Sequence, residues 1–138
     1  MKTSTLIDTN ILIDVWGSPR PWSGWSRDAL VQCRMDGALV VNAIVWSEIA
    51  PSLDARLLAA YAEELDIDRV DLPFEAAYTA GLAHARYRRA GGARERTLPD
   101  FLIGAHASHG GHRLLTRDPS RYGGYFPSVE LLSPETFP

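Results

Sequence analysis

The sequence contains only one cysteine, Cys33, among its 138 residues. A single cysteine cannot form an internal disulfide, and it has no cysteine partners to complete a zinc site. We therefore interpret Cys33 as a small buried side chain in a helix, without a chemical role.

Long apolar runs are also missing. The longest apolar stretches, residues 37–45 and 101–107, are far shorter than the roughly 20 residues that cross a membrane. Residues 1–2 lead directly into a predicted strand rather than into the apolar centre of a signal peptide. We therefore expect a cytoplasmic protein that makes no membrane contact.

Lysine is nearly absent, since 13 of the 14 cationic residues are arginine. The net charge of -3 argues against a protein that coats nucleic acids nonspecifically. Five arginines nevertheless lie within 11 residues, and their planar guanidinium groups suit phosphate or carboxylate ligands. A solvated helix end is the alternative interpretation of this run. The five residues, called the arginine run below, are Arg86, Arg88, Arg89, Arg94 and Arg96.

The composition, 46% hydrophobic and 22% charged, is that of one globular domain. Short apolar runs alternate with stretches of helical periodicity, which predicts an α/β fold with a parallel sheet flanked by helices. The expected strands are residues 3–7, 38–41, 66–72, 113–116 and 129–132. The expected helices are residues 10–15, a helix from 23 or 26 to about 35, and residues 43–49, 54–65, 73–90 and 99–110.

Four acidic residues lie in or directly after apolar segments: Asp8, Glu48, Asp100 and Asp118. Asp8 follows the predicted first strand, and Asp118 comes shortly after the strand that ends near Thr116. In an open parallel sheet, ligands bind beyond the carboxyl ends of the strands. This pattern therefore predicts a shared acidic site at that edge.

Each acid also has a simpler structural explanation. Asp8 could cap the helix that begins near residue 10, and Asp100 completes a near capping box in residues 97–100. Glu48 could lie on a solvent-facing side of its helix, and Asp118 could begin a turn before Pro119. All four explanations would have to hold independently, whereas one shared site accounts for the four residues together.

Clustered carboxylates repel one another and require a compensating cation. Oxygen donors dominate and cysteine ligands are missing, so Mg²⁺ or Mn²⁺ is favoured over Zn²⁺. Thr9, Asn10 and Thr116 add neutral polar groups beside the acids. Such a site suits phosphodiester hydrolysis, because a hard divalent ion activates water and offsets the charge of the reacting phosphate.

Four segments together resemble the PIN domain, and more narrowly the toxins of VapC type: Leu6-Ile7-Asp8-Thr9-Asn10-Ile11-Leu12, Ser47-Glu48-Ile49, residues 98–107 and Leu114-Leu115-Thr116-Arg117-Asp118. The resemblance covers nearly the whole chain and implies a single PIN domain over residues 1–138. The implied fold is a three-layer α/β/α domain with a short, mainly parallel central sheet.

The resemblance also implies roles for individual residues. Asp8, Glu48, Asp100 and Asp118 would be the acidic quartet that binds Mg²⁺ or Mn²⁺, and Thr116 would match the hydroxyl position near the last acid. The implied activity is that of a metal-dependent endoribonuclease. A cognate VapB-type antitoxin would neutralise the protein, which would commonly form a homodimer. Beside such a site, we expect the arginine run to contact RNA phosphates or acidic antitoxin residues.

Other functional classes fit the sequence less well. A phosphatase with an aspartate nucleophile would carry a second acid two residues after Asp8, where this chain has Asn10. A P-loop protein is excluded because the sequence has no glycine-rich loop ending in Lys-Ser or Lys-Thr. The remaining alternative is a noncatalytic PIN-like module that binds RNA or protein.

Histidines and tryptophans give weaker signals. Residues His106, His109 and His112 are evenly spaced, but Gly110-Gly111 should end the helix before the third, so we favour helix-end histidines over a zinc site. Tryptophans can stack on RNA bases, yet more often they bury apolar area. We favour packing for Trp46 and leave both possibilities open for Trp22 and Trp25.

Overall fold

The computed structural model describes residues 3–137 and has a five-stranded sheet at its centre. The strand order is β3-β2-β1-β4-β5, and every neighbouring pair is parallel. The first strand of the chain therefore lies in the middle of the sheet, between β2 and β4. The strands are β1 (Thr5–Ile7), β2 (Leu39–Val41), β3 (Ile67–Arg69), β4 (Arg113–Leu115) and β5 (Leu131–Leu132).

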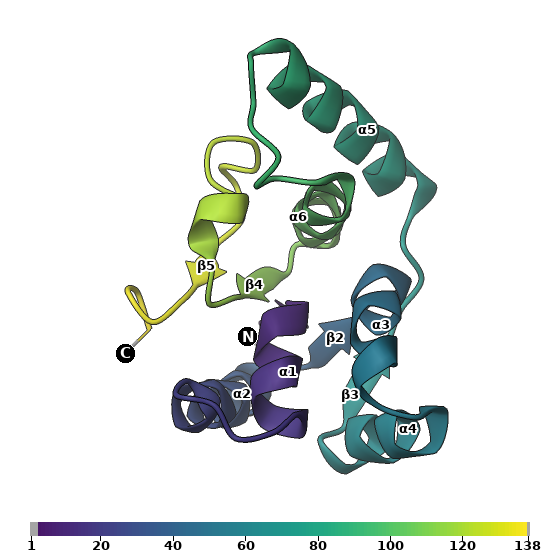
Figure 1. Cartoon of the computed structure of the whole chain (residues 1–138), viewed down its shortest axis with the longest axis vertical. Coiled ribbons are helices and arrows are strands. Elements are labelled where there is room, and N and C mark those ends of the chain that lie inside the picture. The colour runs from purple at the N-terminus through teal and green to yellow at the C-terminus, as the bar shows by residue number, and fades with distance from the viewer. Residues whose placement is uncertain (1–2, 138) are drawn as a thin grey trace.

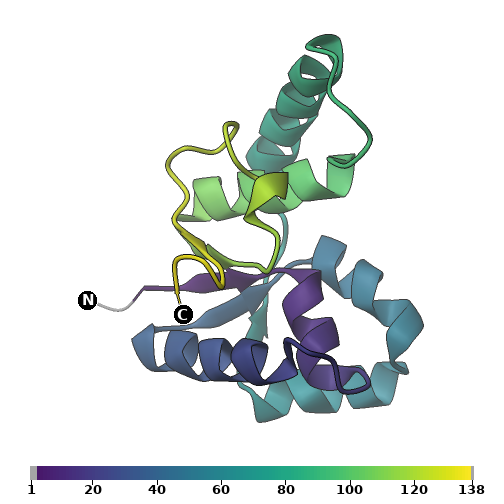
Figure 2. The same ribbon diagram turned by 60° about the vertical axis from the view of Figure 1, so that its left-hand side comes forward.

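Helices cover both faces of this sheet and complete a three-layer α/β/α arrangement. Figure 2 shows α1, α2 and α4 on one side and α6 on the other, with α5 projecting beyond α6. The order of the elements along the chain can be followed in Figure 1. The helices are α1 (Thr9–Trp16), α2 (Ser23–Asp36), α3 (Ala43–Ile49), α4 (Ala55–Glu64), α5 (Phe74–Arg89) and α6 (Leu98–Gly110), with the short 3₁₀ helices η1 (Ala50–Ser52) and η2 (Pro119–Arg121).

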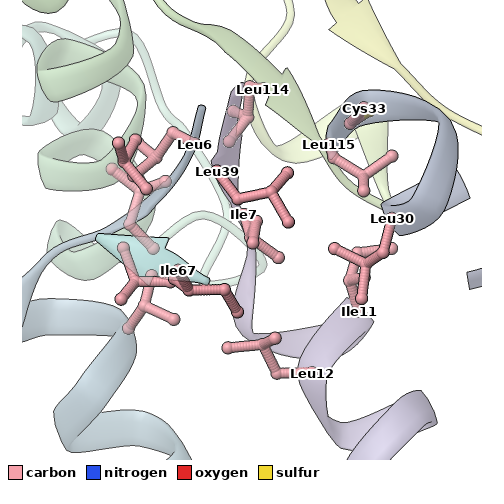
Figure 3. Packing of buried hydrophobic residues seen from close by; sticks show 14 of the residues in the cluster. Leu6, Ile7, Ile11, Leu12, Leu30, Cys33, Leu39, Ile67, Leu114 and Leu115 are labelled. Carbon is pink, nitrogen blue, oxygen red and sulfur yellow. The ribbon is translucent and has the colours of Figure 1, made fainter. Parts of the chain in front are cut away.

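The main hydrophobic core lies around the central strands. Leu6, Ile7, Leu114 and Leu115 are completely buried, as expected for parallel strands that are covered on both faces. Ile7 lies among side chains of α1 and neighbouring strands in Figure 3. Replacing one of these leucines with alanine would cost about 2–5 kcal/mol of stability. The strands that carry the site are therefore held rigidly.

A second, smaller core joins α5 to α6. It contains Ala76, Ala80 and Ala83 of α5, with Phe101 of α6 and Phe126 from the segment after η2. The small alanines let the two helices approach closely. This contact fixes α6, whose first turn carries Asp100.

The structure confirms the predicted α/β class and all of the predicted helices and strands, with differences at their ends. The strand expected at residues 66–72 pairs with β2 only over Ile67–Arg69, and the one expected at 129–132 is shortened to two residues. The first shortening follows from the neighbouring strand, because β2 itself ends at Val41, which pairs with Arg69. The second reflects a turn, since Val129 N–H donates to the carbonyl oxygen of Phe126.

Gly37 shows why the turn between α2 and β2 carries glycine. A Cβ atom at this position would lie 2.3 Å from the carbonyl oxygen of Thr3. The close approach of the two backbones lets the chain enter β2 beside β1. Cys33, one turn earlier, is completely buried in α2 as predicted.

No helix within residues 3–137 is both long enough and apolar enough to span a membrane.

Candidate functional site

The site begins where β1 and β4 end side by side. Asp8 directly follows β1 and is the N-cap of α1, and Thr116 directly follows β4. The backbone N–H of Asp8 donates to the carbonyl oxygen of Leu115, which holds the two strand ends together. The Thr116 hydroxyl then donates to Asp8 Oδ2 at 2.7 Å. Residues 108 positions apart are thus joined at the carboxyl edge of the sheet, as the sequence predicted.

Asp8 is the most deeply buried acid of the site, with 3% of its surface exposed. Burial raises the pKa of its carboxyl, and hydrogen bonds from Thr116, Tyr122 and Thr9 act in the opposite direction. The Tyr122 hydroxyl donates to Oδ2 at 2.8 Å, and the Thr9 N–H donates to Oδ1 at 2.7 Å. Asp8 therefore caps α1 and also takes part in a buried polar network.

Glu48 reaches this network from α3. Its side chain is largely exposed, but its carboxylate accepts a hydrogen bond from the Thr9 hydroxyl at 2.7 Å. Partial desolvation raises the pKa of Glu48, and the negative charges of Asp8 and Asp100 raise it further, against the lowering effect of the Thr9 bond. Thr9 links two of the acids directly, because its hydroxyl donates to Glu48 and its N–H donates to Asp8.

Asp100 has the structural role that the sequence suggested and also faces the other acids. Its Oδ2 accepts hydrogen bonds from the Thr97 N–H at 2.9 Å and the Thr97 hydroxyl at 3.2 Å, within the capping box of α6. Its Oδ1 lies 3.6 Å from Nη1 of Arg121. One oxygen stabilises the helix and the other faces the site, so the capping and site interpretations are compatible.

Asp118 lies at the N-cap of η2 and is partly exposed. The pKa of Asp118 is lowered, chiefly by a hydrogen bond from the Ser120 hydroxyl; burial opposes this shift, and Arg121 lowers the pKa further. The Ser120 hydroxyl donates at 2.6 Å and Arg121 Nε at 2.8 Å. Asp118 therefore remains ionised at neutral pH.

The four residues Asp8, Glu48, Asp100 and Asp118 are called the acidic cluster below. They come from the end of β1, from α3, from the start of α6 and from the segment after β4. Arg121 acts on every member: it contacts Asp100 and Asp118, and its charge lowers the pKa of Asp8 and of Glu48. The structure thus brings together the four acids that the sequence singled out.

Sequence reasoning missed two members of this network, Arg121 and Tyr122. Arg121 lies three residues after Asp118 and supplies the compensating positive charge that clustered carboxylates need. Tyr122 is 2% exposed, and burial together with the charge of Asp8 raises its pKa well above the ordinary value, so its hydroxyl remains a donor. The need for a cation beside the acids was a signal that could have identified Arg121.

The donor set of the cluster fits a hard divalent ion. Its members offer carboxylate oxygens, and the neighbouring Asn10 and Thr116 add amide and hydroxyl oxygens. Within residues 3–137, however, no three acidic, histidine or cysteine side chains are already arranged to hold a metal ion. The chemistry therefore suits Mg²⁺ or Mn²⁺, while Arg121 provides the positive charge in the present arrangement.

The arginine run lies at the end of α5 and in the loop before α6. Arg86, Arg88 and Arg89 occupy the last turn of α5, where positive charge also stabilises the helix dipole. Arg96 packs over Tyr87 and Tyr125 and donates to the carbonyl oxygen of Gly123 at 2.7 Å. Across residues 3–137, no ion pair joins the run to an acid. Members of the run that carry no such contact, such as Arg88 and Arg89, are exposed and could meet an external ligand.

The histidines behave largely as expected. Gly111 ends α6 in the left-handed conformation, with φ of 67°, and so separates His112 from the helix. The rings of His106 and His112 nevertheless meet edge to face at 5.7 Å, a contact that the sequence did not indicate. Burial lowers the pKa of both of these rings. His106 contacts Asn42 and His112 contacts Ser4, which gives them structural partners.

The tryptophans mainly pack. Trp46 is partly buried against the main core, with Arg69 over its ring, which confirms the favoured interpretation. Trp25 also packs against that core and donates from Nε1 to the carbonyl oxygen of Phe137 at 2.9 Å. Trp22 meets Trp25 edge to face and is 45% exposed, so it remains accessible to a ligand.

Residues 5–122 match the family model described as PIN domain. The chain belongs to the PIN domain family. The matched segment includes all four members of the acidic cluster together with Thr116, Arg121 and Tyr122. A comparison with curated protein sequences found no match.

Solved structures share the fold of this PIN domain over almost the full length of both chains. VapBC2 from Rickettsia felis, bound to a DNA fragment from its promoter, superposes with a TM-score of 0.73 at 15% identity, covering 95% of this chain and 98% of that one. A toxin–antitoxin complex from Klebsiella pneumoniae gives 0.68 at 22% identity, covering 94% and 97%. DNA-bound VapBC from Salmonella typhimurium gives 0.68 at 19% identity, covering 96% and 98%.

Proposed function

We propose that this PIN domain is a metal-dependent endoribonuclease of VapC type, the toxin of a toxin–antitoxin pair. The observation that carries the proposal is the acidic cluster, which gathers four carboxylates at the carboxyl edge of a parallel sheet. PIN domains are in general nucleases, and the similar solved structures are toxin–antitoxin and VapBC complexes. RNA as substrate and Mg²⁺ or Mn²⁺ as cofactor belong to the proposal.

Asp8, Glu48, Asp100 and Asp118 would hold the ion, with the hydroxyl of Thr116 beside them. The bound ion would supply activation of a water molecule and neutralisation of charge on the scissile phosphate. No side chain then needs to attack phosphorus, which agrees with a site made of carboxylates and hydrogen-bond donors.

The protein's own contribution is to fix the orientation of the carboxylates. Thr116 and Tyr122 both donate to Oδ2 of Asp8, while the backbone of Thr9 holds Oδ1. The Thr9 hydroxyl similarly orients Glu48. Burial raises the pKa of Asp8, and these donors act against that shift while they fix the orientation of both carboxylate oxygens.

Attraction of RNA requires positive charge beside this negative site. We assign that task to the arginine run, whose members are exposed except for the half-buried Arg96. The same guanidinium groups would suit carboxylates of an antitoxin. A cognate VapB-type antitoxin is the partner that the similar VapBC complexes support. A homodimeric assembly is a further part of the proposal.

RNA cleavage tests the proposal directly. Purified protein would be incubated with a pool of structured RNAs in Mg²⁺, in Mn²⁺ or in chelator, with Asp8→Asn alongside. We expect the wild type to cut only with metal, and the variant to lose about 100-fold or more of the rate, as for the loss of a central catalytic group. Asp28→Asn, an exposed acid on α2, makes the same change in charge away from the site and should cut normally.

The alternative is a noncatalytic PIN module. A folded, metal-binding wild type that leaves every RNA of the pool intact would overturn the nuclease proposal in favour of this alternative. Cleavage by Asp8→Asn at the rate of the wild type would contradict the assigned role of the acidic cluster.

A further inference from the structure

We propose that Arg121 is a resident counterion of the acidic cluster that competes with the divalent ion and thereby limits its affinity. The inference rests on the proposed metal site and adds a regulating residue to it. It assigns a function to a cation that contacts two of the four acids directly.

The contacts of Arg121 support this role. Its Nε donates to Asp118 Oδ2 at 2.8 Å, and its Nη1 lies 3.6 Å from Asp100 Oδ1. The guanidinium thus bridges acids that come from different parts of the chain. Its charge also acts on Asp8 and Glu48, so one side chain compensates the whole acidic cluster. A metal ion bound by the same carboxylates would neutralise the same charge.

The local structure lets the side chain move while the backbone stays fixed. Tyr122, the next residue, is buried and bonded to Asp8, and the N–H of Arg121 donates to the carbonyl oxygen of Asp118. The Arg121 side chain itself is 45% exposed. The guanidinium can therefore leave Asp100 and Asp118 for solvent without disturbing the fold, and a negatively charged phosphate would be a suitable new partner.

Electrostatics gives the direction of the effect. A fixed positive charge a few ångströms from a divalent ion repels it, so ion binding must either displace Arg121 or tolerate its charge. Replacing Arg121 with a neutral residue removes this competition. The gain is limited because the side chain is partly exposed and solvent screens its charge. We expect about a tenfold tighter ion rather than a change of many orders of magnitude.

The first test is a calorimetric titration with Mn²⁺ alone, without RNA. Arg121→Gln should bind Mn²⁺ about tenfold more tightly than the wild type, whereas Arg121→Lys, which keeps the charge, should remain close to the wild type. Arg56→Gln removes an exposed charge on α4 and should leave the affinity unchanged. Tighter binding by Arg121→Gln would exclude a purely structural role for Arg121, because structural damage to the site would weaken Mn²⁺ binding. Equal or weaker binding by Arg121→Gln would overturn the inference.

A second measurement uses the wild type and does not depend on the folding of any variant. The Nε–H of Arg121 is followed by nuclear magnetic resonance as diamagnetic Mg²⁺ is added. We expect its protection from exchange to fall as the bond to Asp118 breaks, while the Nε–H of Arg117, which is bonded to buried Asp14, remains protected. An Arg121 Nε–H that stays protected at saturating Mg²⁺ would contradict displacement.

Asp8→Asn separates this inference from the proposed metal site. If Asp8→Asn binds Mn²⁺ as the wild type does, the assignment of the acidic cluster as the metal site fails. If Asp8→Asn loses binding and Arg121→Gln shows no gain, the metal site stands and the role of Arg121 fails. Absence of Mn²⁺ binding by the wild type and by Arg121→Gln would overturn both.

Discussion

The hydroxyl of Tyr122 provides a sharp test of the buried network around Asp8. In Tyr122→Phe the ring remains in place, and only the donor 2.8 Å from Asp8 Oδ2 is removed. Thr116 and the backbone of Thr9 still donate to the carboxylate. The buried carboxylate of Asp8 therefore loses one hydrogen-bond donor and keeps these two. Because a hydrogen bond to a charged group contributes about 1.5–3 kcal/mol, we expect a loss of this size in the free energy of unfolding at pH 7.

The dependence on pH follows from the raised pKa of Asp8. The folded carboxyl binds its proton more tightly than the unfolded one, whose reference pKa is 3.8. The ionised form therefore costs stability above the raised folded pKa, and this cost disappears as the pH falls from that value toward 3.8. Removing the Tyr122 donor raises the pKa of Asp8 further. The stability difference between wild type and variant should accordingly shrink on acidification.

Urea unfolding of both proteins at neutral pH and near pH 4 measures this difference. Tyr78→Phe is the matched control, because the hydroxyl of Tyr78 belongs to an exposed side chain on α5, and its loss should change stability by less than about 0.5 kcal/mol. If the free energy of unfolding falls with urea concentration at the same slope in all of the proteins, their unfolded states are comparable. A loss below about 0.5 kcal/mol at pH 7, or a difference that does not narrow in acid, would refute the reasoning.

Three further predictions address the charges. Millimolar Mg²⁺ or Mn²⁺ should raise the melting temperature of the wild type and not that of Asp8→Asn, which differential scanning calorimetry would show; no shift in the wild type would count against the site. Arg117→Ala should lower the free energy of unfolding in urea by about 3 kcal/mol, because the buried carboxylate of Asp14 loses its ion-pair partner. Arg34→Ala removes an exposed ion pair with Asp66 and should change the free energy of unfolding little. Neutral substitutions in the arginine run should weaken RNA cleavage and flatten its salt dependence; unchanged cleavage, salt dependence and antitoxin affinity would contradict its role.

The sequence predicted the main framework of the site because the positions of Asp8 and Asp118 depend only on strand ends. Apolar runs locate such ends well, and a parallel sheet brings them to one edge. For Asp100, the predicted capping box is confirmed, and its second oxygen remains available to the site because the two carboxylate oxygens have different partners. A residue pattern alone cannot show that one side chain serves both purposes.

Arg121 and Tyr122 were missed for a geometric reason. Both lie at or just after η2, a single short turn whose side-chain directions have no periodicity that a sequence could reveal. Their roles depend on how the turn folds back over the end of β1, which is a tertiary contact. The pairing of His106 with His112 across the end of α6 was missed for the same reason. The local sequence pattern locates helices, strands and their ends. Contacts between side chains on either side of a turn can be identified only from the folded structure.

The most direct test of the account compares Mn²⁺ binding and RNA cleavage in one preparation of the protein. The two curves should rise over the same range of Mn²⁺ concentration, and Asp8→Asn should lose both while remaining folded. That result would tie the chemistry to the acidic cluster. RNA cutting that persists in chelator, or that survives in Asp8→Asn, would contradict the claim that these carboxylates form a metal-dependent nuclease site.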